Sequence, residues 1–212
     1  MQLSFEEAEQ LLKRYGIKVV ETRKAIAKSQ AVKAAQKIGY PVVLKIDSPD
    51  IIHKTDVGGV KTNLFTPGMV ADAYDELMKK ALRITNNISG VIVQKQLKGH
   101  EIIIGGKQDL QFGPVVLFGL GGIFVEILED ISLRIAPLTK KEALRMIKET
   151  KAYKLLKGVR GSKPANINDL VNTITKVGNL LIDNPLIKEI DLNPCFINEE
   201  QCIAADLRII KE

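Results

Sequence analysis

The sequence predicts an α+β fold in two lobes, and three observations support this class. Short apolar strands alternate with amphipathic helices along the chain. Several neighbouring strands read as hairpins, whereas a doubly wound parallel sheet would place a helix between successive strands. The 212 residues suffice for one large domain or two small ones with a sizeable core.

The first half of the chain contains three helical periods and one hairpin. Ser4 precedes acids that suit a first helical turn, so it serves as an N-cap. The expected elements are a helix from Ser4 to near Gly16, an extended piece over 17–20, a helix over 29–38, a strand over 42–45, its return strand over 60–65 and a helix over 69–82.

The second half is richer in strands. The apolar stretch 112–122 ends in three glycines within four positions, and Thr139 is a plausible N-cap. The expected elements are strands over 91–96, 101–105, 112–122 and 132–137, helices over 138–148 and 170–181, and strands over 188–194 and 202–210.

Composition excludes several classes of function. The two cysteines, Cys195 and Cys202, have no metal-like spacing, so neither a disulfide framework nor a zinc site is expected. No apolar run reaches the roughly 20 residues that cross a bilayer, and acids near the N-terminus argue against a signal peptide, so we expect a cytoplasmic protein. Lys and Glu alternate along helices and aromatic residues are few, so the net charge of +6 favours small anionic ligands over nucleic acid.

The stretch 39–61 carries the strongest chemical signal. Lys45 lies inside an apolar strand, where a charged amine needs an anion, and phosphate is a common one. His53 can accept a phosphoryl group, and the glycine pair Gly58 and Gly59 lets backbone N–H groups approach an anion. Taken singly, these features also fit an edge-strand lysine, a surface histidine and a hairpin turn. Together they favour phosphate chemistry.

A second group of residues suits a magnesium ion. Asp191 and Asn193 lie on the same side of an extended segment, because side chains alternate with period two. Asp206 follows on the next predicted strand, and a hairpin would bring it alongside Asn193. Carboxylate and amide oxygens, completed by phosphate oxygens and water, hold Mg²⁺ at nucleotide sites. The alternative is an Asx-turn at Asn193 and an exposed Asp206.

Two common nucleotide-binding motifs are absent from the sequence. No GxxxxGK[ST] motif occurs, and Gly119-x-Gly121-Gly122 does not open an amphipathic helix with an acid about 20 residues further on. P-loop and Rossmann architectures are therefore disfavoured. A third architecture remains, in which ATP is gripped between two α+β lobes.

Five motifs in order resemble a known family. They are Gly-Tyr-Pro-Val-Val-Leu-Lys (39–45), Ser-Pro-Asp-Ile-Ile-His-Lys-Thr-Asp-Val-Gly-Gly-Val (48–60), Phe-Gly-Leu-Gly-Gly-Ile-Phe-Val-Glu (118–126), Arg-Ile-Ala-Pro-Leu (134–138) and Glu-Ile-Asp-Leu-Asn-Pro (189–194). The chain from about Leu3 to Lys211 resembles the ATP-grasp beta subunit of archaeal ADP-forming acetyl-CoA synthetases. These are nucleoside-diphosphate-forming acyl-CoA synthetases related to succinyl-CoA synthetase.

This resemblance implies one ATP-grasp domain over 1–212, with lobe one over about 20–95 and lobe two over about 96–212 plus the N-terminal helix. It implies the reversible conversion of acetyl-CoA, ADP and phosphate into acetate, CoA and ATP, with ATP/ADP and Mg²⁺ bound to this chain. A separate CoA-binding alpha subunit is the implied partner, in an alpha2-beta2 heterotetramer. His53 matches the position of a phosphohistidine that relays the phosphoryl group.

The resemblance also assigns residues to the nucleotide. They are Lys45 for its phosphates, Gly58 and Gly59 in a glycine-rich lid, Gln94, Lys95, Gln96 and Leu97 in the adenine hinge, and Glu101 for the ribose. Asp191, Asn193 and Asp206 match the magnesium site. Arg134 and Arg160 are expected to contact phosphate or the partner subunit, and His100 is expected to be incidental.

Two other functions remain open from the sequence. One is a stand-alone ATP-grasp ligase that activates a carboxylate, which would leave His53 without a role. The other is a non-catalytic nucleotide-sensing module, which would not need a histidine. Activity that requires a CoA-binding partner would distinguish the relay subunit from both.

Overall fold

The computed structural model describes residues 1–51, 54–121, 130–158 and 163–212. They form two compact units, a smaller unit over 20–97 and a larger unit over 1–19 and 98–212. All strand pairs in the two sheets are antiparallel, as the α+β prediction requires. No helix among the described residues is long and apolar enough to cross a membrane.

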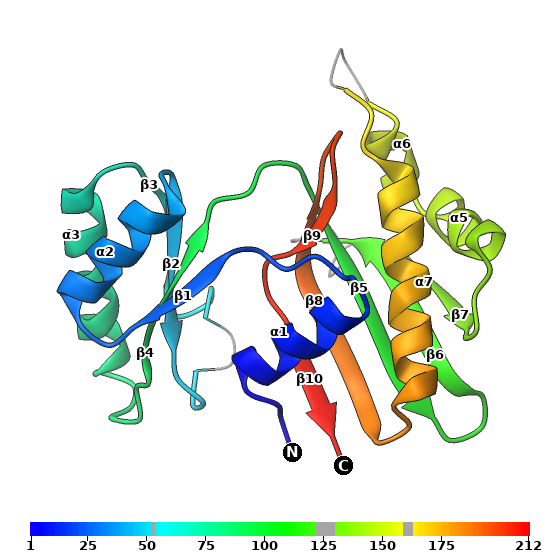
Figure 1. Cartoon of the computed structure of the whole chain (residues 1–212), viewed down its shortest axis with the longest axis horizontal. Helices are drawn as coiled ribbons and strands as arrows, with labels where there is room; N and C mark the ends of the chain where they lie inside the picture. Colours follow the sequence, from blue (N-terminus) through cyan, green and yellow to red (C-terminus); the bar gives the residue numbers. More distant parts are fainter. Residues whose placement is uncertain (52–53, 122–129, 159–162) are drawn as a thin grey trace. The chain divides into compact units, whose positions relative to one another are not determined.

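The smaller unit is a four-stranded sheet with two helices packed against it (Figure 1). Its elements are β1 (Thr22–Ala25), α2 (Lys28–Ile38), β2 (Val42–Asp47), β3 (Val60–Leu64), α3 (Pro67–Ala81) and β4 (Gly90–Lys95), and the strand order is β1-β4-β2-β3. Fully buried Leu44, Leu77 and Val93 join the sheet and α3 in one core. The predicted hairpin is confirmed, since β2 pairs with β3.

Strand β1 was missed by sequence reasoning. Its four residues, Thr-Arg-Lys-Ala, carry little apolar patterning, and only Ala25 is buried. The strand forms because β4 offers a backbone edge, to which Thr22 through Ala25 pair opposite Gln94 through Val91. Tertiary pairing therefore determines this strand rather than local propensity.

The N-terminal helix begins where the sequence predicted. Helix α1 (Phe5–Arg14) has a capping box, in which the Ser4 hydroxyl accepts a hydrogen bond from the Glu7 N–H and the Glu7 carboxylate accepts one from the Ser4 N–H. The helix buries Ala8, Leu11 and Leu12 in the core of the larger unit.

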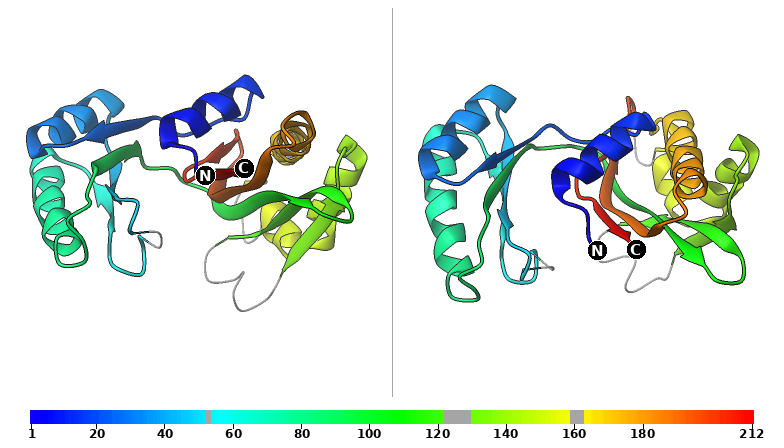
Figure 2. Two further views of the ribbon diagram at one scale, coloured as in Figure 1. Left: turned by 90° about the horizontal axis from the view of Figure 1, so that it is seen from below. Right: turned by 60° about the horizontal axis from the view of Figure 1, so that its bottom comes forward.

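The larger unit is built on a six-stranded sheet. Its remaining elements are β5 (His100–Asp109), β6 (Gly113–Leu120), β7 (Ile131–Ile135), α5 (Lys140–Glu149), α6 (Ala152–Leu156), α7 (Ile167–Asp183), β8 (Ile187–Ile197), β9 (Cys202–Ala204) and β10 (Arg208–Lys211). The order is β10-β8-β5-β6-β7, with β9 also paired to β8. Helices α1 and α7 lie across one face of this sheet (Figures 1 and 2).

The two faces of the six-stranded sheet differ in character. Ile104, Val116 and Ile190 alternate with outward residues and form the core under the helices. We call the opposite side the outer face; it carries Glu101 and Asp191, which occupy the intervening positions of β5 and β8.

The predicted strand over 202–210 is wrong in one respect. It is two strands, β9 and β10, separated by residues 205–207. The interruption lies beside a bulge in β8, where the Pro194 carbonyl accepts hydrogen bonds from the N–H groups of Ala205 and Asp206. The short helix α6 was also not predicted.

Candidate active site

Lys45 lies in the interior of the smaller sheet. It stands opposite Val60 of β3 and Ile92 of β4, so β2 is not an edge strand. Only 9% of the residue is exposed. An ammonium so placed has lost much of its hydration and is suited to binding an anion. The alternative of an edge-strand lysine is therefore wrong.

The glycine turn is closed by its own backbone. The N–H of Gly58 donates to the Thr55 carbonyl at 3.0 Å, and the N–H of Gly59 donates to the Lys54 carbonyl at 2.6 Å. Gly58 has a φ of +64°, and a Cβ at Gly59 would lie 2.8 Å from the Lys54 oxygen. Glycine is thus required at both positions, although in this structure both N–H groups bond within the turn. His53 lies outside the described residues.

The expected adenine hinge begins in β4. Gln94 is buried and donates from Nε2 to the Thr22 hydroxyl at 3.1 Å. Lys95 donates from Nζ to the carbonyls of Gly39 and Tyr40, each at 2.9 Å. These contacts fix the end of β4 against β1 and the turn before β2.

Gln96 and Leu97 complete the expected hinge. Two hydrogen bonds join the Gln96 side-chain amide to Asn63. Gln96 Nε2 donates to Asn63 Oδ1 at 2.8 Å, and the backbone N–H of Asn63 donates to Gln96 Oε1 at 2.6 Å. Asn63 has a φ of 59°, a conformation that asparagine tolerates better than most residues. Leu97 is half-buried and is the last residue of the smaller unit.

Glu101 lies on the outer face of β5, opposite Phe196 of β8. Its side chain is exposed. Its carbonyl accepts the N–H of Gly121 at 2.8 Å, and a Cβ at Gly121 would lie 2.8 Å from the Glu101 carbonyl carbon. A glycine is therefore needed where the chain leaves β6.

The structure brings Asp191, Asn193 and Asp206 together in the larger unit. Asp191 lies on β8, and Asn193 is exposed at the bulge two residues later. The Pro194 carbonyl accepts the Ala205 N–H at 3.0 Å and the Asp206 N–H at 3.3 Å. The segment that carries Asp206 is thereby folded against Asn193 and Pro194, as the predicted hairpin required.

The electrostatics of this cluster suit a divalent cation. Burial raises the pKa of Asp191, and the carboxylates of Glu189 and Asp206 raise it further, while Arg208 lowers it. Oxygen donors crowded in this way are the ligands that Mg²⁺ prefers. No three His, Cys, Asp or Glu side chains within the described ranges are arranged to hold a metal. A bound Mg²⁺ would therefore also need the Asn193 oxygen, water or phosphate oxygens.

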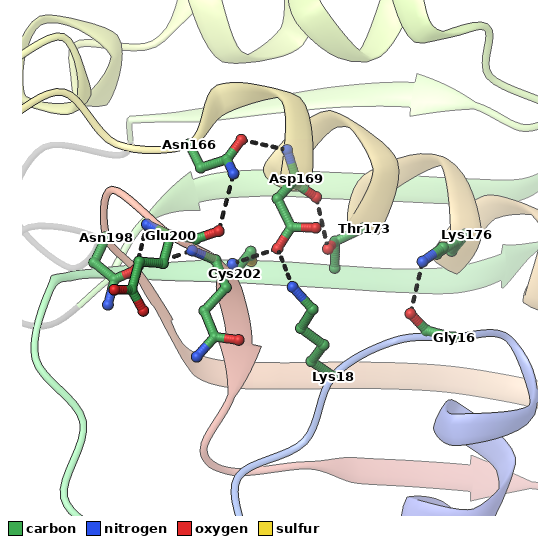
Figure 3. A network of polar contacts seen from close by, with 10 residues as sticks. Gly16, Lys18, Asn166, Asp169, Thr173, Lys176, Asn198, Glu200 and Cys202 are labelled. Atoms are coloured by element: carbon green, nitrogen blue, oxygen red, sulfur yellow. Dashed lines mark hydrogen bonds and ion pairs between the residues drawn. The ribbon is translucent and has the colours of Figure 1, made fainter.

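A polar network around Asp169 fixes the hairpin next to this cluster (Figure 3). The Asp169 carboxylate accepts hydrogen bonds from the Cys202 N–H at 2.8 Å and from Lys18 Nζ at 3.0 Å. Asn166 caps α7 by accepting the Asp169 N–H, and it donates to the Glu200 carbonyl at 2.9 Å. These bonds hold β9, which leads directly into the segment with Asp206.

Arg134 lies on the opposite side of the sheet from Asp191. On the neighbouring strand β6 it stands opposite the core residue Val116. Its guanidinium contacts both carboxylate oxygens of Glu149 in α5 at 2.5 Å. The hydrogen bond from Arg134 lowers the pKa of Glu149. The structure therefore separates Arg134 from the metal-site candidates. Arg160 is outside the described part of the chain.

Sequence reasoning missed two charged residues on the outer face, Glu189 and Arg208. Arg208 stands directly opposite Asp191 and forms an ion pair with Glu189. The Glu189-x-Asp191-x-Asn193 spacing was a signal that could have identified Glu189. Arg208 could be assigned to this face only once the pairing of β10 with β8 was known.

Comparisons with known proteins show which proteins the chain resembles. The model of the ATP-grasp domain matches residues 1–210. The chain is 51% identical to the Pyrococcus furiosus protein named acetate–CoA ligase [ADP-forming] I subunit beta, covering 96% of this chain and 89% of that protein. It is 46% identical to the Nitrosopumilus maritimus 4-hydroxybutyrate–CoA ligase [ADP-forming], covering 96% of this chain but only 30% of that longer protein.

A solved structure shows the same similarity in three dimensions. It is Ca. Korarchaeum cryptofilum dinucleotide-forming acetyl-coenzyme A synthetase 1 in complex with coenzyme A and Mg-AMPPCP, with its phosphohistidine segment pointing towards the nucleotide-binding site. It superposes with a TM-score of 0.85 at 42% identity, covering 100% of this chain and 93% of that one. The family resemblance and the fold class predicted from the sequence are confirmed.

Proposed function

The chain belongs to the ATP-grasp family, and from that premise we propose that it is the nucleotide-binding beta subunit of an ADP-forming acetate–CoA ligase. The observation that carries the proposal is the convergence of Asp191, Asn193 and Asp206 on one side of the larger sheet. The similarity of the chain, over 96% of its length, to a protein named as such a beta subunit also supports the proposal.

The overall reaction converts acetyl-CoA, ADP and phosphate into acetate, CoA and ATP. We assign to this chain the last step, in which a phosphoryl group leaves a histidine for ADP. The P–N bond breaks and its electron pair stays on the ring nitrogen, while a P–O bond forms to an oxygen of the terminal phosphate of ADP. The imidazole leaves neutral because its other ring nitrogen carries a proton. His53 is the proposed carrier on this chain.

Each proposed binding residue has a physical role. The Lys45 ammonium neutralises phosphate charge, and the turn with Gly58 and Gly59 covers the phosphates. Backbone groups of residues 94–97 bond the adenine, and the Glu101 carboxylate accepts hydrogen bonds from the ribose hydroxyls.

The proposed metal site has a separate role at the phosphates. Asp191, Asn193 and Asp206 would hold Mg²⁺, which when bound offsets negative charge on the phosphates. An additional phosphate or subunit contact from Arg134 or Arg160 stays a prediction of the sequence.

The proposed partner is a CoA-binding alpha subunit in an alpha2-beta2 heterotetramer. The chain spans only 30% of the single-chain ligase from Nitrosopumilus maritimus. The Pyrococcus furiosus relative, of which 89% is covered, is instead named as a subunit beta, and this name supports a partner that carries the CoA-binding and acyl-phosphate chemistry. A cytoplasmic location also stays a prediction.

The test is phosphoryl labelling of the purified complex. Wild-type chain, His53→Ala and His100→Ala are each incubated with γ-labelled ATP, Mg²⁺ and the CoA-binding subunit. We expect acid-labile, base-stable label on this chain in the wild type and in His100→Ala, and none in His53→Ala. His100 is the matched control because it is the only other histidine of the sequence.

Three results would contradict the proposal in different ways. A complex that makes ATP while this chain never takes label removes His53 from the relay. Ligase activity of the isolated chain would favour the stand-alone enzyme instead. Nucleotide binding without activity in any combination would favour the sensing module.

A further inference from the structure

Arg208 is a cation of the larger unit that stands directly across from a candidate metal residue. It lies on β10 opposite Asp191, on the outer face of the sheet. It follows Asp206 by two residues, so both belong to the chain segment folded against β8. Its position contrasts with that of Arg134, which faces α5 on the other side of the sheet.

The guanidinium of Arg208 is anchored on one side and lacks an acceptor on another. One terminal nitrogen is ion-paired with the carboxylate of Glu189. The Nε atom is buried and has no hydrogen-bond partner within the described residues. A buried donor without an acceptor is unfavourable and uncommon in native proteins. This donor therefore calls for an acceptor that the described residues do not provide.

A structural role explains this arrangement poorly. Arg208 and Glu189 expose 39% and 41% of their side chains, and ion pairs with that exposure add little to stability. Two uncharged residues would satisfy the strand pairing without leaving a buried donor. The arginine would be favoured, however, by an anion at the outer face, because its planar fork suits phosphate oxygens.

We propose that Arg208 binds the γ-phosphate of ATP, beside the position at which Asp191, Asn193 and Asp206 would hold a metal. This inference rests on the proposed function. Glu189 holds the Arg208 guanidinium in place. The side chain turns toward the phosphate oxygens, and its Nε–H donates to them. The positive charge of Arg208 also offsets the repulsion between the phosphate and the surrounding carboxylates.

The test compares ADP, which lacks the γ-phosphate, with AMPPCP, which carries it. Binding of ADP and of AMPPCP is measured by calorimetry with Mg²⁺ for the wild-type chain, Arg208→Gln, Arg208→Lys and Glu189→Gln. Lys188→Gln is the matched control, because Lys188 lies on β8 in an exposed ion pair with Glu212 and its loss removes the same charge. Thermal unfolding of every variant is recorded.

We expect Arg208→Gln to weaken AMPPCP binding by about 10- to 100-fold, the range for a charge-assisted hydrogen bond, and to affect ADP much less. Arg208→Lys should recover part of the loss, since lysine keeps the charge but not the fork. Lys188→Gln should bind both ligands as the wild type does. Glu189→Gln should retain most of the AMPPCP affinity, since Arg208 is still present.

Other outcomes would overturn the inference. If Arg208→Gln binds both ligands as the wild type does, the arginine does not contact phosphate. If Arg208→Gln and Glu189→Gln lose equal affinity for both ligands, the pair is only structural. If the wild-type chain binds neither ligand, the proposed function itself fails, and this inference fails with it.

Discussion

Replacing Lys45 by methionine should weaken nucleotide binding without unfolding the smaller unit. Methionine keeps the length and the apolar stem but removes the ammonium. Because Lys45 is only 9% exposed, water screens its interaction with a phosphate weakly. A charged hydrogen bond of about 1.5–3 kcal/mol corresponds to a rise in the Kd for Mg-ADP of about 10- to 100-fold.

The assay is calorimetric titration of Mg-ADP into Lys45→Met and into Lys61→Met as control. Lys61 lies on the neighbouring strand β3, opposite Leu44, and pairs with Glu76 at 2.6 Å. Its loss removes the same charge from the same sheet, and we expect no measurable change in Kd. Equal weakening in both variants would show that general charge, and not the position of Lys45, governs binding. An unchanged Kd in Lys45→Met would refute the assignment directly.

Three further changes have defined outcomes. Asp206→Asn should reduce the Mg²⁺ dependence of nucleotide binding, measured by titrating Mg²⁺ at fixed ADP, because one carboxylate of the cluster is lost. Gly59→Ala should lower the melting temperature, because its Cβ would meet the Lys54 carbonyl oxygen at 2.8 Å. Gly68→Ala in α3 should not lower it, because a Cβ there would make only an ordinary contact with the Thr66 hydroxyl at 3.9 Å. Arg134→Gln should remove most of the stabilisation that the lowered pKa of Glu149 provides, because the hydrogen bond from Arg134 is the largest cause of that lowering. This contribution is present above the unfolded pKa of about 4.3 and is lost as pH falls through the folded pKa, so acid unfolding curves should show the change.

The elements that the sequence predicted well are those with strong local signals. Helices α1 and α5 are capped by Ser4 and Thr139, and both caps form capping boxes. The hairpin of β2 and β3 follows from an apolar run, a glycine pair and a second run. In each case the information lies within a few residues, so no tertiary contact is needed to recognise it.

The elements that were missed depend on distant partners. Strand β1 exists because β4 pairs with it. The separation of β9 from β10 depends on the Pro194 carbonyl, which meets the N–H groups of Ala205 and Asp206. The spacing of Asp191 and Asn193 placed them together correctly, but it could not show that Arg208 lies opposite.

Strand β7 shows why the two arginines could not be assigned from the sequence. Alternation alone would turn Leu133 and Ile135 inward and Arg134 outward. The structure has the reverse: Leu133 and Ile135 are 51% and 53% exposed, and Arg134 reaches Glu149 at the end of α5. The orientation is set by the carboxylate on α5, which gives the arginine a partner on the helix-covered side. A charged residue in an edge strand can therefore be assigned to a face only when its partner on another element is known, and the same holds for Arg208 with Glu189.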